Sequence, residues 1–455
     1  MSPVETLDAG EQLDADEAVS RPLPGLILAW SAGAPEYRAI ASQRRPLTFG
    51  RAGGDADITV PDGLVSRQHA EFRVVGERAT LRDLGSRNGL YVDGERCGEA
   101  TLNEGSVVRI GHSLLVYTAD IRGLGGEVER EDGALVDPCL RRTWDRIARF
   151  AELSRHLLVR GESGTGKELA ARTFHRVTGG ADRPFVAVNC AAIPEGVAER
   201  LLFGTRKGAY SGAGNDAPGY VQAAHGGTLF LDEFGELDLG VQAKLLRFLE
   251  SGEALPLGAV RPLRLDVRVC LATNRDLREE VADGRFRGDL YYRVAEPSVI
   301  LPPLRQRKQS IPWLVQDALD ALTGLSAHPL LIERCLLRPW PGNVRELRMA
   351  IAAAGQEAQL GDRAQVLRSD LPDDAGETVN RRPAAARGPK PADTPAPSEH
   401  EASSPSLRGT DDAAILDMLK KTGGNVSKAA RRLGVHRNQL RRWLQKKGLD
   451  ANSLR

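Results

Sequence analysis

The stretch LLVRGESGTGKELAARTFH, residues 157–175, decides the fold of the central part of the chain. An apolar run that suits a strand leads into a glycine-rich turn, and a helical sequence follows. In such a turn successive backbone N–H groups face phosphate oxygens, and the positive end of the new helix points at them. The ammonium of Lys167 can then reach the β- and γ-phosphates, so the spacing predicts a P-loop. The predicted nucleotide-binding residues are Gly161, Glu162, Ser163, Gly164, Thr165, Gly166, Lys167 and Glu168.

A pair of carboxylates follows about 65 residues later, at the end of the apolar stretch TLFLDE. A Ser or Thr usually comes after a P-loop lysine and binds Mg²⁺, but Glu168 occupies that position here, so the metal must depend on another carboxylate. We expect Asp232 to hold Mg²⁺ and Glu233 to orient the water that attacks ATP. The two motifs together predict an ATPase.

The balance of acidic and basic side chains changes along the chain. Over all 455 residues, 62 basic side chains nearly cancel 61 acidic ones, so the net charge of +1 predicts no polyanion partner by itself. Residues 410–455 hold eleven Lys or Arg against four Asp, which makes this end a candidate for binding nucleic acid.

The five cysteines form no metal-binding or CxxC pattern, and we expect them to be reduced and mostly buried. No apolar run approaches the roughly 18 residues that cross a bilayer, so we expect a cytoplasmic, nucleoid-associated protein with no membrane partner.

The pattern of apolar, helical and turn-forming residues changes along the chain and predicts a multidomain protein. Short β-branched stretches at close spacing over residues 25–120 indicate an all-β sandwich. Apolar runs that alternate with helical stretches indicate a parallel α/β domain, and helical sequence then continues as a lid. The predicted parts are an acidic disordered tail (1–23), the sandwich (24–122), the α/β ATPase core (135–305), the helical lid (306–372), a disordered Pro/Ala/Ser linker (373–409) and an all-α helix-turn-helix (410–455).

Residues 135–350 resemble the AAA+ ATPase domain of bacterial enhancer-binding proteins, the activators of sigma-54 RNA polymerase. The motifs that carry the resemblance occur in the order of that family: GESGTGKE, PFVAVNCAAIPE, LFGTRKGAYSGA, GGTLFLDEFGEL, QAKLLRFLESGE, DVRVCLATNRDL, FRGDLYYRV, LPPLRQR and WPGNVREL. The family ordinarily has Glu after the P-loop lysine, so Glu168 fits it.

The resemblance also implies roles for individual residues. Asn274 would read the γ-phosphate, and Asn189 would switch the position of Glu233. Arg287 and Arg293 would reach the ATP of a neighbouring subunit, so that hydrolysis depends on assembly of the chain into a homo-oligomer, from a dimer to a hexameric ring. Arg345 would sense the nucleotide from the lid of the same subunit.

The stretch GAYSGA resembles the GAFTGA loop with which the family contacts sigma-54. The implied contact residues are Gly208, Ala209, Tyr210, Ser211, Gly212 and Ala213. Tyr210 and Ser211 keep an aromatic ring and a hydroxyl, but Leu201 replaces a usual acid, Thr205-Arg206 replaces a typical His-Glu, and the lid is shorter than usual. These differences leave two alternatives open: an AAA+ regulator that works without sigma-54, and a phosphopeptide-binding DNA scaffold with a vestigial ATPase.

The flanking parts resemble two binding modules. FGRAGG, VSRQHAEF and DLGSRNGLYVDG resemble the forkhead-associated (FHA) domain, which binds phosphothreonine, and the alternative is a sandwich that serves only for contacts with the ring. Guanidinium groups and neutral donors suit a phosphate dianion, and the implied residues are Arg51, Ser66, Arg67, Arg87 and Asn88. His69 is expected to brace the loops, and Leu90 replaces the family's usual Thr.

Residues 411–449 resemble the helix-turn-helix of the factor-for-inversion-stimulation (Fis) type. A helix from about 436 would enter the major groove of double-stranded DNA, where Asn and Gln read adenine and Arg reads guanine. The implied DNA-binding residues are His436, Arg437, Asn438, Gln439, Arg441 and Arg442. The whole sequence therefore predicts a transcription activator with a phosphothreonine input from a Ser/Thr kinase pathway, an ATP-driven ring and a DNA-anchored output.

Overall fold

The computed structural model describes residues 22–378 except positions 132, 180, 181, 195, 210–214 and 323, together with Ile415, Asp417, Met418 and Ala429. The chain divides into two units, Met1–Asn380 and Arg381–Arg455. Four sets of predictions lie outside the described residues: the tail 1–21, the loop residues Tyr210, Ser211, Gly212 and Ala213, the linker after Thr378, and the DNA-binding residues from His436 to Arg442.

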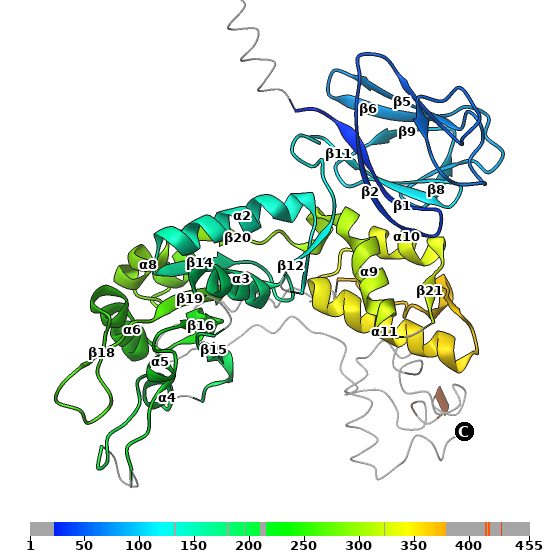
Figure 1. The fold of residues 1–455 in the computed structure, drawn as a ribbon. Coiled ribbons are helices and arrows are strands. Elements are labelled where there is room, and N and C mark those ends of the chain that lie inside the picture. The colour runs from blue at the N-terminus through cyan, green and yellow to red at the C-terminus, as the bar shows by residue number, and fades with distance from the viewer. Residues whose placement is uncertain are drawn as a thin grey trace, which may run out of the picture. The chain divides into compact units, whose positions relative to one another are not determined.

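The first part of the chain is a β-sandwich, as predicted (Figure 1). Its six-stranded sheet has the order β2-β1-β11-β10-β7-β8, with bounds Ala34–Ala41, Gly25–Ser31, Ser113–Thr118, Val107–Ile110, Leu90–Val92 and Glu95–Cys97. Its five-stranded sheet has the order β4-β3-β5-β6-β9, with bounds Ile58–Thr59, Leu47–Gly50, Ala70–Val75, Arg78–Asp83 and Glu99–Leu102. Side chains such as Phe49, Phe72 and Leu115 fill the space between the sheets.

Strands β1 and β11 are buried along their whole length, which is unusual for an antiparallel sheet with one solvated face. Along β11, Leu115 and Tyr117 belong to the core of the sandwich, whereas Leu114 and Val116 belong to a second hydrophobic cluster. The alternation arises because successive side chains of a strand point to opposite faces. The six-stranded sheet must therefore pack against another element.

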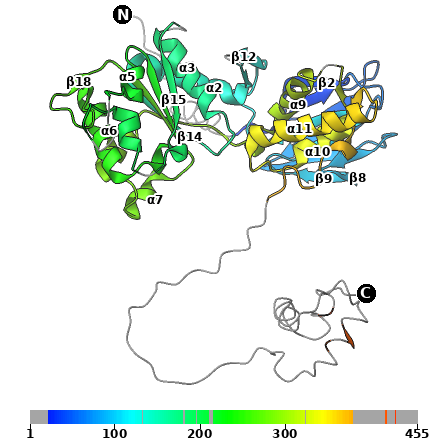
Figure 2. The same cartoon turned by 90° about the horizontal axis from the view of Figure 1, so that it is seen from below.

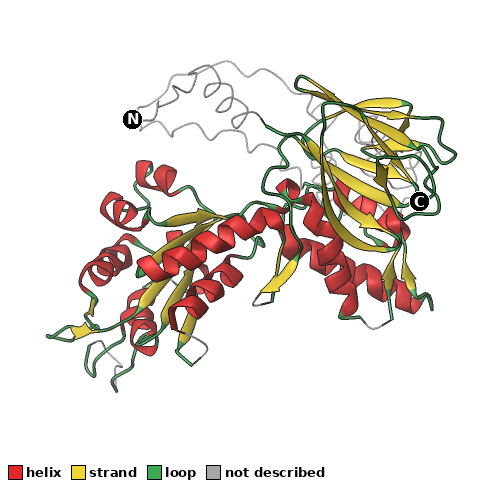
Figure 3. Cartoon of the chain, turned by 45° about the horizontal axis from the view of Figure 1, so that its top comes forward, coloured by secondary structure: helices red, strands yellow, loops and turns green. Residues whose placement is uncertain are grey.

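The central part is a parallel α/β domain with the strand order β15-β16-β19-β14-β20. The strands are Phe185–Asn189, Thr228–Asp232, Arg268–Thr273, His156–Arg160 and Ser298–Ile300. Helices cover both faces (Figure 3), so the strands are apolar on both sides: Leu157 and Val159 face α2 and α3, and Leu158 belongs to the core formed with α6 and α8. All five strands run in one direction, which brings their carboxyl ends to one edge of the sheet.

The helices of this domain are α2 (Pro138–Leu153), α3 (Lys167–Gly179), α4 (Ala198–Phe203), α5 (Tyr220–Ala223), α6 (Leu239–Ser251), α7 (Leu277–Ala282) and α8 (Gly288–Val294), with short turns η1 (Cys190–Ala192) and η2 (Phe234–Glu236). Two hairpins complete it: β12 and β13 (Glu129–Glu131 and Ala134–Val136) precede α2, and β17 and β18 (Glu253–Ala254 and Leu263–Arg264) follow α6.

A helical lid follows the sheet (Figure 2). It consists of η3 (Leu304–Gln306), η4 (Lys308–Ser310), α9 (Ile311–Asp320), β21 (Ser326–Ala327), α10 (Pro329–Leu337), α11 (Asn343–Leu360), β22 (Gln365–Val366) and η5 (Arg368–Asp370). Its hydrophobic core, around Ile332 and Trp340, is continuous with the cluster that contains Leu114 and Val116 of the sandwich. The predicted sandwich, α/β core and helical lid are thus confirmed.

Two further expectations concern the whole described chain. All five cysteines are described and free, and Cys190, Cys270 and Cys335 are buried, as predicted. Within residues 22–378 and the four later described positions, no helix combines the length and the apolarity that a membrane crossing requires.

Candidate nucleotide-binding site

The P-loop connects β14 to α3 and has a backbone that only glycine adopts easily. Gly164 and Gly166 have φ angles of +77° and +107°. The hydroxyl of Thr165 donates a 2.7 Å hydrogen bond to the carbonyl oxygen of Glu162, which closes the loop on itself. A Cβ atom on Gly164 would lie 2.2 Å from the carbonyl oxygen of Gly342 in the lid. Glycine at this position therefore also permits the close approach of the lid.

The two predicted carboxylates lie next to the P-loop lysine. The Nζ atom of Lys167 donates hydrogen bonds to the carbonyl oxygen of Gly161 over 3.1 Å and to Oε1 of Glu233 over 3.2 Å. The other carboxylate oxygen of Glu233 accepts a 3.3 Å bond from the backbone N–H of Asn274. Burial raises the pKa of Asp232, while the nearby charge of Lys167 opposes this. Four predicted residues, from the ends of the two strands β16 and β19 and from the start of α3, thus meet at the carboxyl edge of the sheet.

Glu233 adopts a left-handed backbone conformation, with φ +50° and ψ +42°. A non-glycine residue in this region is strained by about 1 kcal/mol, and such strain concentrates at functional sites. The conformation ends β16 at Asp232 and brings the Glu233 carboxylate to the Lys167 ammonium, where it forms a largely buried ion pair.

The lid is bonded to the P-loop through Asn343, the first residue of α11. Its Nδ2 atom donates to the carbonyl oxygen of Ser163 over 3.0 Å and to a carboxylate oxygen of Glu162 over 3.1 Å. The same Glu162 carboxylate forms a bidentate pair with Arg305, at 2.6 and 2.8 Å, and this pairing lowers its pKa. Arg345 donates a 3.1 Å bond to the hydroxyl of Ser163. The entry to the lid at η3 and the start of α11 therefore hold the same turn of the P-loop.

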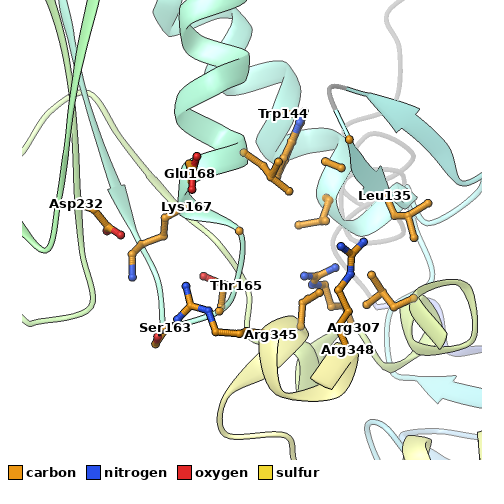
Figure 4. Close-up of a pocket in the computed structure, with 18 of the residues that line it drawn as sticks. Leu135, Trp144, Ser163, Thr165, Lys167, Glu168, Asp232, Arg307, Arg345 and Arg348 are labelled. Atoms are coloured by element: carbon orange, nitrogen blue, oxygen red, sulfur yellow. Dashed lines mark hydrogen bonds between the residues drawn. The ribbon is translucent and has the colours of Figure 1, made fainter. Parts of the chain in front are cut away.

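A cavity of about 370 Å³ lies between the P-loop and the lid (Figure 4). Lys167 and Asp232 lie at one end, and the apolar side chains of Leu135 and Trp144 lie at the other (Figure 4), while Leu314 of the lid also lines the cavity. Three arginines line the lid side: Arg307, Arg345 and Arg348. This size is within the usual range for small-molecule sites, and the cavity combines a cationic end with an apolar end, as a nucleoside polyphosphate requires.

For three predicted residues, the structure of the single chain, over the residues that it describes, does not show the contacts that their proposed roles require. Asn189 lines the cavity, but its side-chain oxygen accepts a 3.0 Å bond from the N–H of Ala191, and no hydrogen bond joins it to Glu233 in the described part of the chain. Arg287 forms an ion pair with Asp289 at 2.7 Å, and Arg293 donates to the carbonyl oxygen of Leu249 over 2.8 Å. Neither arginine lines the cavity of its own chain, so a contribution to a neighbouring subunit stays a prediction.

Several residues that build the site were not among those predicted from the sequence. Arg307 is within the quoted motif LPPLRQR and Asn343 within WPGNVREL, so the motifs contained the signal. The apolar lining of the cavity gave no local signal, because Leu135 comes from the hairpin before α2 and Leu314 from the lid.

The predicted phosphothreonine residues lie on neighbouring loops of the sandwich. The backbone N–H of Arg51 donates to the carbonyl oxygen of Ser66 over 3.0 Å, and that of Arg87 donates to the Ser66 hydroxyl over 3.1 Å. The side-chain amide of Asn88 donates to the carbonyl oxygen of Leu64 over 2.7 Å. The side chains of Arg51, Arg67 and Arg87 are exposed. Three guanidinium groups are thus presented on loops that are bonded to each other.

His69 braces these loops, as predicted. It is fully buried, its Nδ1 atom accepts a 3.1 Å bond from the N–H of Ser66, and its Nε2 atom lies 3.1 Å from the carbonyl oxygen of Gly89. Burial lowers the pKa of His69, so the ring is neutral at pH 7.

Of the predicted sigma-54 contact loop, the structure describes Gly208 and Ala209. They follow a stem in which Thr205 forms bridges with Ala217 and Leu257. Arg206, the residue that departs from the usual acid, forms an ion pair with Asp216 across this stem. The changed charge at the base of the loop thus has a partner.

The fold and the cavity define a class. A P-loop between a parallel strand and a helix, a pair of carboxylates at the end of a neighbouring strand and a helical lid bonded to the loop are the features of an AAA+ ATPase domain. The sequence profile of the sigma-54 interaction domain matches residues 135–299, that of the FHA domain matches residues 47–111, and that of the Fis family of bacterial regulatory proteins matches residues 406–446. The chain belongs to the family of sigma-54-dependent transcriptional regulators.

Three curated relatives illustrate the similarity. The Nif-specific regulatory protein of Bradyrhizobium diazoefficiens is 34% identical over 413 residues, which cover 83% of this chain and 68% of that protein. The transcriptional regulatory protein ZraR of Salmonella typhimurium is 38% identical over 345 residues, which cover 73% and 74%. The acetoin catabolism regulatory protein of Cupriavidus necator is 38% identical over 325 residues, which cover 70% of this chain but 47% of that protein. The chain thus spans about half the length of the last relative.

Proposed function

We propose that this chain hydrolyses ATP to activate transcription by sigma-54 RNA polymerase, from a DNA site bound by its C-terminal helix-turn-helix and in response to a phosphothreonine protein bound by its sandwich. The observation that carries the proposal is the meeting of Lys167, Asp232, Glu233 and Asn274 at one end of a cavity that the lid closes. A vestigial site would not be expected to keep Glu233 hydrogen-bonded to both Lys167 and the N–H of Asn274, with Asp232 accepting a bond from the N–H of Glu233.

The cavity suggests how ATP is held. The adenine fits the apolar end between Leu135 and Trp144, and the phosphates fit the N–H groups of the P-loop and the start of α3. Asp232 suits Mg²⁺, because its carboxylate is at the phosphate end and burial already disfavours its ionised form without a cation. When bound, Mg²⁺ neutralises charge that develops on the phosphates.

The Lys167–Glu233 pair suggests how hydrolysis is controlled. Phosphate oxygens compete with Glu233 for the Lys167 ammonium, since both are anionic partners of the same donor. Phosphate binding would therefore release the Glu233 carboxylate to orient a water molecule beside the γ-phosphate. Asn274, whose N–H donates to the same carboxylate, would sense this change. Arg287 and Arg293 would complete the site of a neighbouring subunit in a ring of up to six chains.

The sandwich supplies the proposed input. A phosphothreonine dianion matches Arg51, Arg67 and Arg87 with hydroxyl and amide donors from Ser66 and Asn88. Since the loops that carry these groups are bonded to one another and braced by His69, the site is preorganised.

A phosphate-release assay on the purified chain tests the ATPase. Lys167→Ala should abolish nucleotide binding, whereas Glu233→Gln should keep binding and lower turnover by about 100-fold. Lys244→Ala is the matched control, because Lys244 lies in α6 outside the cavity and pairs with Glu199. Unchanged phosphate release in both site variants contradicts the assignment.

Open-complex formation tests the transcriptional role. The purified chain with ATP should convert a closed complex of sigma-54 RNA polymerase to the open form, and Glu233→Gln should not. Turnover without open complexes would favour the alternative of a regulator that works without sigma-54, which the altered GAYSGA loop raises. Open complexes formed without turnover would contradict the proposal as a whole.

A further inference from the structure

The sandwich has a second apolar face, which packs on the lid. Trp30, Val107, Leu114 and Val116 of the six-stranded sheet belong to the same hydrophobic cluster as α9 and α10. We call these four residues together with Arg109 the lid-docking face. Trp30 is fully buried, and both Figure 1 and Figure 2 show the strands of this sheet beside the lid helices. Burial of this kind is typical of the interior of a domain and not of a contact between loosely tethered domains.

A charged pair lies inside this apolar contact. The Nε atom of Arg109 in β10 lies 2.9 Å from Oε1 of Glu333 in α10, and the two side chains are only 15% and 8% exposed. The guanidinium of Arg109 also stacks 3.7 Å from the ring centre of Tyr91. A buried charge without its partner is strongly disfavoured, so the pair fixes the orientation of the lid-docking face on α10.

Polar contacts at the edge follow the same interface. Lys308 of η4 donates a 2.8 Å bond to the carbonyl oxygen of Gly105 in the sandwich. The rings of His112 and His328 lie edge to face with centres 5.8 Å apart, and the Nδ1 atom of His328 accepts the N–H of Leu330 at the start of α10. The contact thus reaches from η4 to the first turn of α10.

The interface continues to the wall of the nucleotide cavity. Tyr37 of β2 is half-buried, and its hydroxyl oxygen is buried near Asp137, at the start of α2, and Cys139. Burial, followed by the charge of Asp137, raises the pKa of Tyr37. The Asp137 carboxylate caps α2 through the N–H groups of Cys139 and Leu140, accepts from the hydroxyl of Ser310, and lies 4.0 Å from the guanidinium of Arg307. Arg307 lines the cavity.

We propose that the lid-docking face clamps the lid, so that the sandwich holds Arg307, Leu314 and Arg345 at the nucleotide and sets the affinity of the site. This inference rests on the proposed nucleotide site. The physical reason is preorganisation: a lid held in place by the sandwich loses less conformational freedom when the nucleotide binds, and binding is therefore tighter. The sandwich would then both bind phosphothreonine and support the lid that lines the nucleotide cavity.

The test reverses the two buried charges in the full chain, singly and together. Arg109→Glu and Glu333→Arg each place like charges in contact and should separate the face from α10. We expect amide exchange of α9 and α10 to rise about ten-fold or more, and affinity for a fluorescent ADP analogue to fall about three-fold or more. The double variant restores opposite charges and should return both quantities to within about two-fold of the original chain.

Arg73→Glu is the matched control, because Arg73 is an exposed residue of the other sheet and pairs with Glu71 at 3.4 Å. It should change neither quantity. If a reversal unfolds the chain, Glu333→Gln removes the charge with the shape retained and should give smaller shifts in the same direction.

Two outcomes overturn the proposal. One is amide exchange of α9 and α10 that does not respond to the single reversals, and the other is faster exchange with unchanged ADP affinity. Failure of the original chain to bind ADP would instead contradict the proposed nucleotide site, and with it the effect on affinity, while the exchange measurement would still show whether the face is docked.

Discussion

The Nδ2 atom of Asn343 lies 3.0 Å from the carbonyl oxygen of Ser163, so the first residue of lid helix α11 is bonded directly to the P-loop. The Oδ1 atom of the same side chain accepts a 2.7 Å bond from the buried N–H of Leu304, where the chain enters the lid. One fully buried amide therefore joins the P-loop, the entry to the lid and α11. Movement of the lid and occupation of the P-loop cannot be independent.

We predict that Asn343→Ala lowers the free energy of unfolding by about 2–3 kcal/mol, because it leaves the buried N–H of Leu304 without an acceptor. Asn343 also has a φ angle of +52°, which glycine adopts more easily than alanine. Asn343→Gly should therefore be more stable than Asn343→Ala by about 1 kcal/mol, although both lose the same hydrogen bonds. Urea unfolding of the three chains checks this order, and equal midpoints would contradict it.

Because the ion pair between Arg206 and Asp216 lies at the base of the GAYSGA loop, we expect that its loss impairs open-complex formation but not ATP hydrolysis. Both side chains are about half exposed, so the pair itself contributes little stability. Asp216 also accepts a 2.8 Å bond from the N–H of Lys207, which fixes the stem of the GAYSGA loop. Asp216→Ala should leave phosphate release within about two-fold of the original chain but lower open-complex formation by about five-fold or more.

Asp120→Ala is the control for this variant, because Asp120 forms a comparable exposed pair with Arg122 in the sandwich. It should leave both activities unchanged. An equal loss of phosphate release and of open complexes in Asp216→Ala would contradict this prediction. It would show that the stem affects ATP hydrolysis itself and not the coupling of hydrolysis to open-complex formation.

The buried histidines predict how stability depends on pH. Burial lowers the pKa of His69 and of His156, so the folded chain favours their neutral rings. An unfolded chain protonates these histidines near pH 6.5, which means that it binds more protons than the folded chain below this value. The free energy of unfolding should therefore fall as the pH falls from about 7.5 to about 5.5. Urea midpoints over this range measure the effect.

The pH range in which the buried histidines change stability lies above the range in which the paired carboxylates do. Asp57, whose pKa of about 2 is lowered first by its bond from the N–H of Thr48 and then by Arg45, loses its contribution only below about pH 4. In His156→Gln the decrease between about pH 7.5 and about pH 5.5 should be smaller. A midpoint that rises as the pH falls would contradict the assigned direction.

The raised pKa of Asp232 predicts that the charge which ATP hydrolysis requires at this residue destabilises the folded chain. Its ionised form is disfavoured by burial in the fold, so at pH 7 removal of the charge should stabilise the chain. Asp232→Asn should raise Tm by roughly 1–2 °C and abolish ATP hydrolysis. Asp238→Asn is a suitable comparison, because Asp238 caps α6 and Asn caps helices equally well. A lower Tm for Asp232→Asn would contradict the prediction.

The parts of the site that could be predicted from the sequence are those whose chemistry is local. Gly164, Gly166 and Lys167 depend on a single turn, and Asp232 and Glu233 on a single strand end, so their spacing was sufficient. The parallel α/β class of the central domain and the lid as a separate helical part followed from the alternation of apolar and helical stretches, but the order of the strands did not.

The remaining parts depend on contacts between distant segments. The stretches GLILAWS and SLLVYT of β1 and β11 are apolar at nearly every position, which could have indicated that both faces are covered. No local pattern names the partner, however, and Glu333 is 224 residues from Arg109. The same holds for Leu135 and Leu314, which meet only because the lid folds over the hairpin before α2.

The strand β11, with its two buried faces, bears on how such regulators diversify. Input modules are often regarded as interchangeable attachments, but a replacement for this sandwich would leave α9 and α10 without a cover and Glu333 without a counter-charge. Domain shuffling at this junction would therefore have to be accompanied by substitutions in the lid. Chimeras that exchange the sandwich together with the lid should therefore give folded protein more often than chimeras that exchange the sandwich alone.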